Sequence, residues 1–63
     1  MNTDKTKFVR PREIAKLLKL NIVTIYEYIQ SGRLRAIKFG RTYRIEKKDL
    51  ELFIEENVVK ARE

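Results

Sequence analysis

The sequence contains no cysteine and no histidine, and each absence excludes a class of functional site. Without cysteine there is no disulfide, no thiolate nucleophile and no Cys-based zinc site. Without histidine there is no His metal ligand, no His general base and no His-containing catalytic triad. Only two glycines occur, Gly32 and Gly40, and their spacing forms neither a Walker loop nor a dinucleotide fingerprint. We therefore expect no catalytic residues, no metal and no cofactor.

Long apolar segments are absent as well. No apolar run is long enough to span a membrane, and residues 1–7 are polar and lack the apolar centre of a signal peptide. We expect no membrane contact and a bacterial-type cytoplasmic location. The 63 residues suffice for one small domain with a thin core, which leaves little room for a deep pocket. No small-molecule ligand is expected.

Charge is plentiful and unevenly distributed. The chain carries 15 basic and 9 acidic residues, a formal net charge of +6. Residues 5–48 hold thirteen basic and three acidic residues, whereas residues 49–63 hold two basic and five acidic ones. A basic domain with this asymmetry attracts polyanions, of which nucleic acid is the commonest. The alternative is a basic surface that serves solubility alone.

Periodic apolar residues predict three helices. The first runs over about 11–18, with Pro11 at its first position and Ile14, Leu17 and Leu18 on its buried face. The second runs over about 22–30, capped by Asn21 and ended near Gly32. The third starts near 46–48 and has an apolar stripe with acidic residues on its exposed side; the stripe is Leu50, Phe53, Ile54, Asn57 and Val58.

Between the second and third helices the period changes to that of a β-hairpin over residues 34–45, with a turn at Gly40. Turn chemistry favours a two-residue loop, Gly40-Arg41. A three-residue loop or a bulge would instead place all apolar residues of the hairpin on one face, and Lys38 with Arg44 on the other. We expect the second register, because burial of one continuous apolar face outweighs a turn preference.

The predicted fold is mainly α with a small antiparallel β-hairpin: a helix-turn-helix followed by a wing and a third helix. Residues 8–15, 20–29, 31–45 and 48–54 resemble the corresponding parts of excisionase-family helix-turn-helix domains, relatives of the MerR DNA-binding domain. The string Ser31–Ile45 is the most specific part. The resemblance implies a winged helix-turn-helix that binds DNA, as an excision factor or a small transcriptional regulator. The chain ends too soon for the long dimerisation helix and effector domain of MerR proteins.

Two positions depart from the family pattern. Arg10 stands where the family usually has a Thr or Ser cap for the first helix, and beside DNA it would serve as a phosphate contact. Glu27 stands where the family often has a basic residue. An acid on this face repels phosphate, so Glu27 must either accept a hydrogen bond from cytosine N4 or pair with a nearby Arg or Lys.

The expected partner is double-stranded DNA, with the second helix in the major groove and the wing on an adjacent groove or backbone. Eleven residues are expected to contact it: Asn21, Val23, Thr24, Tyr26, Glu27, Gln30, Arg33, Lys38, Arg41, Thr42 and Arg44. Tyr43 is expected to pack under the wing, and Arg35 to be solvated. The location would then be nucleoid-associated.

Further partners are an integrase or recombinase, or more copies of this chain on DNA. The alternative function is a protein-interaction module that docks an integrase or polymerase through the acidic third helix. We expect a flexible N-terminus over residues 1–7, the DNA-binding domain over 8–59 and a frayed C-terminus over 60–63.

Overall fold

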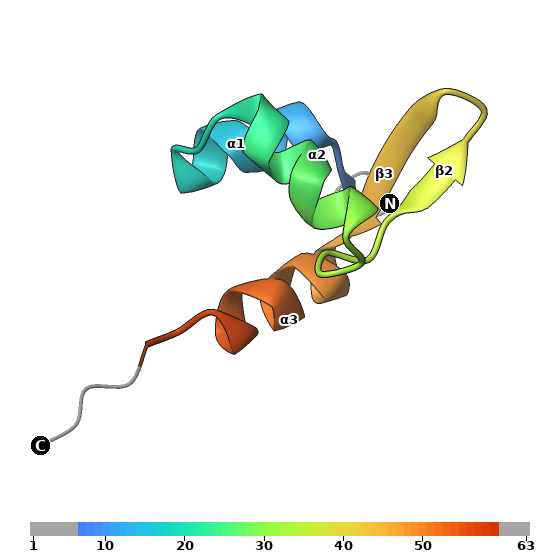
Figure 1. Ribbon diagram of the computed structural model, residues 1–63. Coiled ribbons are helices and arrows are strands. Elements are labelled where there is room, and N and C mark those ends of the chain that lie inside the picture. The colour runs from blue at the N-terminus through green and yellow to red at the C-terminus, as the bar shows by residue number, and fades with distance from the viewer. Residues whose placement is uncertain (1–6, 60–63) are drawn as a thin grey trace, which may run out of the picture.

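The computed structural model describes residues 7–59. The elements follow in the order β1 (Phe8–Val9), α1 (Pro11–Leu18), α2 (Ile22–Gln30), β2 (Ile37–Phe39), β3 (Thr42–Glu46) and α3 (Lys47–Glu56). The three helices lie together and the β2–β3 hairpin, which we call the wing, projects away from them (Figure 1). The prediction of a mainly helical fold with three helices and a small antiparallel sheet is confirmed, and it is consistent with a winged helix-turn-helix. The flexible N-terminus predicted for residues 1–7 and the frayed C-terminus predicted for 60–63 lie outside the described residues, except for Lys7, whose carbonyl accepts from the Lys47 N–H at 2.9 Å.

Local sequence explains where the first two helices begin and end. Pro11 is the first residue of α1, and the Arg10 N–H donates to Glu13 Oε1 at 2.9 Å. The guanidinium has no acceptor, so only this half of a capping box forms. Lys19 ends α1 in the left-handed region at φ 58°, and the Leu20 N–H bonds to the Ala15 carbonyl at 2.9 Å. Asn21 then caps α2 as predicted, because its Oδ1 accepts from the Val23 N–H at 2.8 Å.

The sheet has three strands in the order β1-β3-β2, all antiparallel. The sequence predicted only a short apolar anchor at Phe8-Val9, whereas the structure pairs Phe8 with Glu46 and Val9 with Ile45. This pairing ties the segment before α1 to the last residues of the wing. It leaves the outer part of β3, towards Thr42, without a partner strand on the β1 side.

The predicted register of the wing is wrong. Lys38 pairs with Tyr43 and Phe39 pairs with Thr42, which leaves a two-residue loop of Gly40 and Arg41. Gly40 has φ 64° and Arg41 does not have a positive φ, as in a type II′ turn with glycine at its first central position. Only the base of the wing, at Ile45, lies over the core. The outer part gains nothing from a continuous apolar face, and turn chemistry therefore decides the register.

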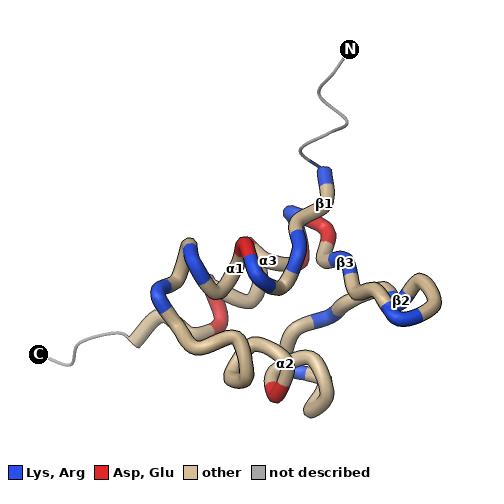
Figure 2. Tube along the Cα trace, turned by 90° about the horizontal axis from the view of Figure 1, so that it is seen from above, with Lys and Arg blue, Asp and Glu red and all other residues tan. Residues whose placement is uncertain are grey.

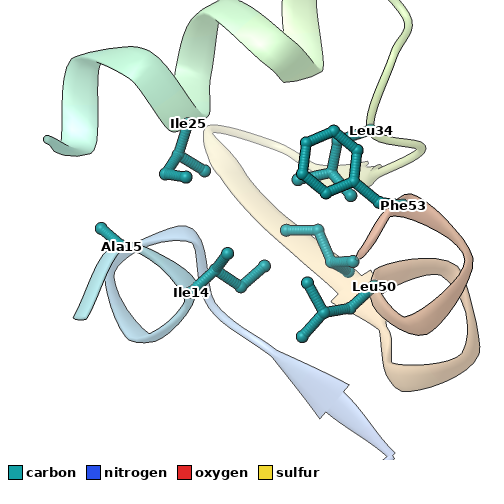
Figure 3. Packing of buried hydrophobic residues seen from close by; sticks show 7 residues of the cluster. Ile14, Ala15, Ile25, Leu34, Leu50 and Phe53 are labelled. Carbon is teal, nitrogen blue, oxygen red and sulfur yellow. The ribbon is translucent and has the colours of Figure 1, made fainter. Parts of the chain in front are cut away.

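The core is small and draws on every helix. Ile14, Ala15, Ile25, Leu50 and Phe53 point towards a common centre, as Figure 3 shows. Leu34, from the loop after α2, and Ile45, from β3, complete the cluster. The Tyr28 ring packs against the Phe53 ring with centroids 4.9 Å apart.

Two of the predicted core faces are only partly buried. Leu17, expected on the buried face of α1, is 64% exposed, because the helix turns its Ile14, Ala15 and Leu18 side to the core. Ile54 and Val58, expected in the buried stripe of the third helix, are also exposed. Helix α3 ends at Glu56, so Val58 lies beyond its last turn.

Candidate nucleic-acid interface

Helix α2 buries one side and leaves the other free. Ile25 is fully buried, whereas Val23, Glu27 and Gln30 are exposed. These three positions are spaced i, i+4 and i+7 and share one helix face. Tyr26 lies at the edge of this face, and Thr24 is half-buried. The predicted contact residues of the second helix thus form one outward surface with Thr24 at its margin.

The outward face of α2 is almost free of charge. The helix contains no Lys or Arg, and Glu27 is its single charged residue. Figure 2 shows Lys and Arg on α1 and on the strands of the wing instead. Helix α2 is exposed and has the shape to enter a groove, but it carries no Lys or Arg itself. The Lys and Arg residues that flank it come from α1 and the wing.

Four arginines surround an open hollow of about 460 Å³ beside α2. Arg10 and Arg12 come from the start of α1, and Arg41 and Arg44 from the wing. The rest of the lining is Pro11, Ile22, Tyr26, Thr42 and Tyr43, so the lining contains no acidic side chain. We call this feature the arginine hollow. It lies where the outer part of β3 has no partner strand, and it presents a concentrated positive charge to a polyanion.

Aromatic contacts fix the position of the wing relative to α2. The Tyr26 and Tyr43 rings meet edge to face, with centroids 5.8 Å apart and an interplanar angle of 63°. Lys38 Nζ lies 5.6 Å from the centroid of the Tyr43 ring. Tyr43 therefore packs on the α2 side of the wing, and Lys38, its cross-strand partner, shares that side.

The observed register separates two residues that the sequence placed together. Arg44 is paired with Ile37, so it lies on the opposite face of the wing from Lys38. Arg44 is half-buried, and its Nη1 donates to the Tyr43 carbonyl at 2.9 Å. The expectation that Lys38 and Arg44 share one outward face is thus wrong. Arg44 instead joins Arg41 and Thr42 in the lining of the arginine hollow.

The α2–β2 loop carries two further arginines with different surroundings. Arg33 is exposed directly after Gly32, which ends α2 at φ 84°. Arg35 is exposed, as expected, with 67% of its side chain accessible, and it also pairs with Asp49 at 2.9 Å and Glu46 at 3.7 Å. These contacts link the loop to the start of α3 and place two carboxylates beside the Arg35 guanidinium. Glu27 was expected either to contact cytosine N4 or to pair with a nearby Arg or Lys. Among residues 7–59 it makes no ion pair.

The eleven contact residues expected from the sequence do not include Arg12, and Arg10 was expected to contact phosphate only where it lies beside DNA. The signal available was the basic segment 10–12, but nothing in the sequence shows that it lies beside residues 41–44.

Within the described residues no group of His, Cys, Asp and Glu could hold a metal ion. None of the helices described is both long and apolar enough to cross a membrane.

Comparison with known proteins agrees with this geometry. The helix-turn-helix domain family matches residues 8–58 of the chain. Two curated relatives, each named as a putative DNA-binding protein, come from Mycobacterium tuberculosis strains CDC 1551 / Oshkosh and ATCC 25618 / H37Rv. Each is 32% identical over 44 residues, which cover 70% of this chain and 56% of the relative, so the match spans little more than half of those proteins. No solved structure matches the chain. Because the family match covers most of its length, the chain belongs to the helix-turn-helix domain family, a DNA-binding fold.

Proposed function

We propose that this protein binds double-stranded DNA sequence-specifically and acts without catalysis, either in site-specific recombination as an excisionase does or as a small transcriptional regulator. The observation that carries the proposal is the near-neutral outward face of α2 beside the arginine hollow. Phosphate contacts supply affinity and base contacts supply specificity. The arginine hollow has the positive charge that phosphate contacts require, and the near-neutral face of α2 has the polar and apolar groups that base contacts require.

In the proposed complex α2 enters the major groove, which is about 12 Å wide and admits one helix. Val23 and Thr24 would meet base edges or thymine methyl groups, and Gln30 would donate to and accept from an adenine edge. Glu27, with no cationic partner among the described residues, would accept from cytosine N4. Asn21 Oδ1 is used for the helix cap, so its amide nitrogen remains to donate to a phosphate.

The arginine hollow would hold the backbone beside that groove. Arg10 and Arg12 approach it from α1, and Arg41, Thr42 and Arg44 from the wing. Tyr26 lines the same hollow, and its hydroxyl can donate to phosphate. Arg33 and Lys38, both exposed, would add phosphate contacts at the far end of α2 and along the wing.

Selection of bound duplexes from a random pool, followed by footprinting, tests this proposal. We expect a defined sequence motif whose centre is protected in the major groove. Thr24→Ala and Gln30→Ala should relax the preference at single positions and retain most of the affinity, whereas Arg41→Glu should weaken binding to every sequence. A pool that emerges without sequence enrichment, or equal effects of all three changes, would contradict specific readout by α2.

Two roles within DNA binding remain to be separated by experiment, because a shared fold does not define a role. As an excision factor the protein would bind DNA in adjacent copies, bend it and assist an integrase. A recombination assay with and without the cognate integrase tests this role, and the architectural role is wrong if bending and cooperative binding are both absent. A regulator would instead occupy an operator and alter transcription from it.

A second candidate function is favoured by α3. Its residues Glu51, Glu55 and Glu56 are exposed, and the described ion pairs do not involve them. The helix would then dock a basic surface of an integrase or polymerase. If the protein shifted no duplex at low salt and still bound such a partner, interaction would be its main task.

A further inference from the structure

One side of the sheet faces away from α2 and carries two exposed phenylalanines. Phe8 on β1 pairs with Glu46, and Phe39 on β2 pairs with Thr42. Because side chains alternate along β3, both rings lie on the same side of the sheet as Arg44, opposite the side that meets α2. Phe8 is 39% exposed and Phe39 is 57% exposed. We call the set Phe8, Phe39, Thr42 and Arg44 the outer sheet face.

The outer sheet face is hollowed. Its four residues line an open hollow of about 410 Å³. Strand β1 ends at Val9, where the chain turns to begin α1, so among residues 7–59 no strand continues along the outer part of β3 on that side. The two phenyl rings therefore come from the strands on either side of β3, and Arg44 comes from β3 itself, with the space between them left open.

The charge in this hollow is positive, because Arg44 is the one charged residue in its lining. Arg44 Nη1 donates to the Tyr43 carbonyl at 2.9 Å, and the guanidinium has further N–H groups that can donate to a ligand. Glu46 also lies on this side of the sheet, but it does not line the hollow, and its carboxylate contacts Arg35 at 3.7 Å. The turn at the tip of the wing adds Arg41, which is exposed. The outer sheet face thus combines aromatic rings with positive charge.

An aromatic and positively charged surface fits nucleic acid whose bases are unpaired. Each unpaired base has a flat π-face that stacks on an aromatic side chain, while a basic residue holds the phosphates of the strand. A second copy of this chain fits less well, because two-fold packing on this face would bring a second Arg44 into the same hollow. Thr42 and Arg44 also line the arginine hollow, so the outer sheet face is continuous with that cationic surface.

We propose that the outer sheet face binds single-stranded DNA, with bases stacked on Phe39 and Phe8 and a phosphate held by Arg44. Stacking on a ring requires no particular base, so this binding tolerates many sequences. The choice of DNA as the strand rests on the proposed function, because a duplex backbone in the arginine hollow brings an unpaired strand of the same DNA to Thr42 and Arg44. The protein would then hold a duplex and an adjoining unpaired strand together.

The test uses the full chain and fluorescence anisotropy with labelled oligomers of about ten nucleotides. The probe is an oligodeoxyuridylate. A chain of abasic deoxyribose phosphates of the same length lacks only the bases, and an oligouridylate adds only the 2′-hydroxyl groups. We expect the oligodeoxyuridylate to bind about tenfold more tightly than the abasic chain and no more weakly than the oligouridylate. Amide NMR shifts should appear at Phe39 and Thr42 and be absent at Val23 and Gln30.

Matched variants separate stacking from general attraction. Phe39→Ala should weaken oligodeoxyuridylate binding about fivefold or more. Phe39→Leu should weaken it as well, because leucine keeps the apolar bulk and loses the π-face, whereas Phe39→Tyr should retain the affinity. Leu52→Ala is the control, since Leu52 is 57% exposed, as Phe39 is, but lies on α3. All four variants should keep the helical circular dichroism signal and the affinity of the unaltered chain for a blunt duplex.

Three results would overturn the proposal: equal binding of the abasic chain, insensitivity of oligomer binding to Phe39→Ala, or tighter binding of the oligouridylate, which would assign the face to RNA. Binding of an acidic, phenylalanine-containing peptide in place of the oligomer would assign it to a protein partner. Failure of the proposed function would look different. The blunt duplex would then not bind, while the oligodeoxyuridylate would still bind in a manner that depends on Phe39.

Discussion

Removing two arginines from the arginine hollow should change the salt dependence of DNA binding by a predictable amount. The perturbation is Arg12→Gln with Arg41→Gln, one residue from each side of the hollow. Both side chains are exposed and hold no other element in place, so folding should be preserved. The matched control is Arg35→Gln, because Arg35 does not line the hollow and already pairs with Asp49 and Glu46 on the α3 side.

The magnitude follows from counting cations that can reach phosphate. The four arginines of the hollow, Arg33 and Lys38 make six. Each neutralised phosphate contributes about −0.9 to the slope of log K against log salt, which gives a slope of roughly −5.4 for the unaltered protein. Two lost contacts reduce this to roughly −3.6. A fourfold increase in salt would then weaken the unaltered protein about 1,800-fold and the variant only about 150-fold.

Anisotropy titrations of a labelled duplex over a fourfold salt range measure both slopes. Arg35→Gln should keep the slope of the unaltered protein. A slope near zero for the unaltered chain would refute a phosphate-based mode of binding. An unchanged slope in the paired variant, or an equal change in the Arg35 variant, would show that the arginine hollow is not where the backbone lies.

Stability measurements by thermal or chemical unfolding check three further predictions. Lys19→Gly should raise the free energy of unfolding by about 0.5–1 kcal/mol, because φ 58° strains a residue with a Cβ; a decrease would show that Lys19 makes a contact that outweighs the strain. Gly32→Ala should lower it by about 1 kcal/mol from its φ of 84° alone, since a Cβ there meets nothing within 4 Å, and no loss would refute the strain argument. Ile45→Ala should cost about 2–5 kcal/mol and largely unfold so small a domain, whereas Leu52→Ala should change little; similar losses would contradict the assigned core.

Local sequence signals predicted the helices well. Pro11 and Asn21 mark the starts of α1 and α2, and the observed bounds of both helices coincide with the predicted ones. These signals act over a single turn, so they operate independently of the rest of the chain. The wing was predicted as a hairpin for the same reason, from the glycine that its turn requires.

Predictions that depended on long-range packing were less successful. The register of the wing was wrong because the argument assumed a core under the whole hairpin, whereas only Ile45 reaches one. Arg12 was missed, and Arg44 was placed with the wrong neighbour, because the arginine hollow joins residues 10–12 to residues 41–44. The ion pair of Arg35 with Asp49 was not predicted, because the two residues lie fourteen positions apart. Periodicity says which side of an element is apolar, but not which other element it meets.

The separation of charge from the outward face of α2 has an evolutionary consequence. Because α2 contains no Lys or Arg, exchanges at Val23, Glu27 or Gln30 alter the presented chemistry and leave the cationic flanks intact. Ile25, which anchors α2 in the core, is not among them. In the proposed mode of binding, a lineage built on this scaffold would acquire new target sequences by a few substitutions, without passing through intermediates that no longer bind DNA or no longer fold.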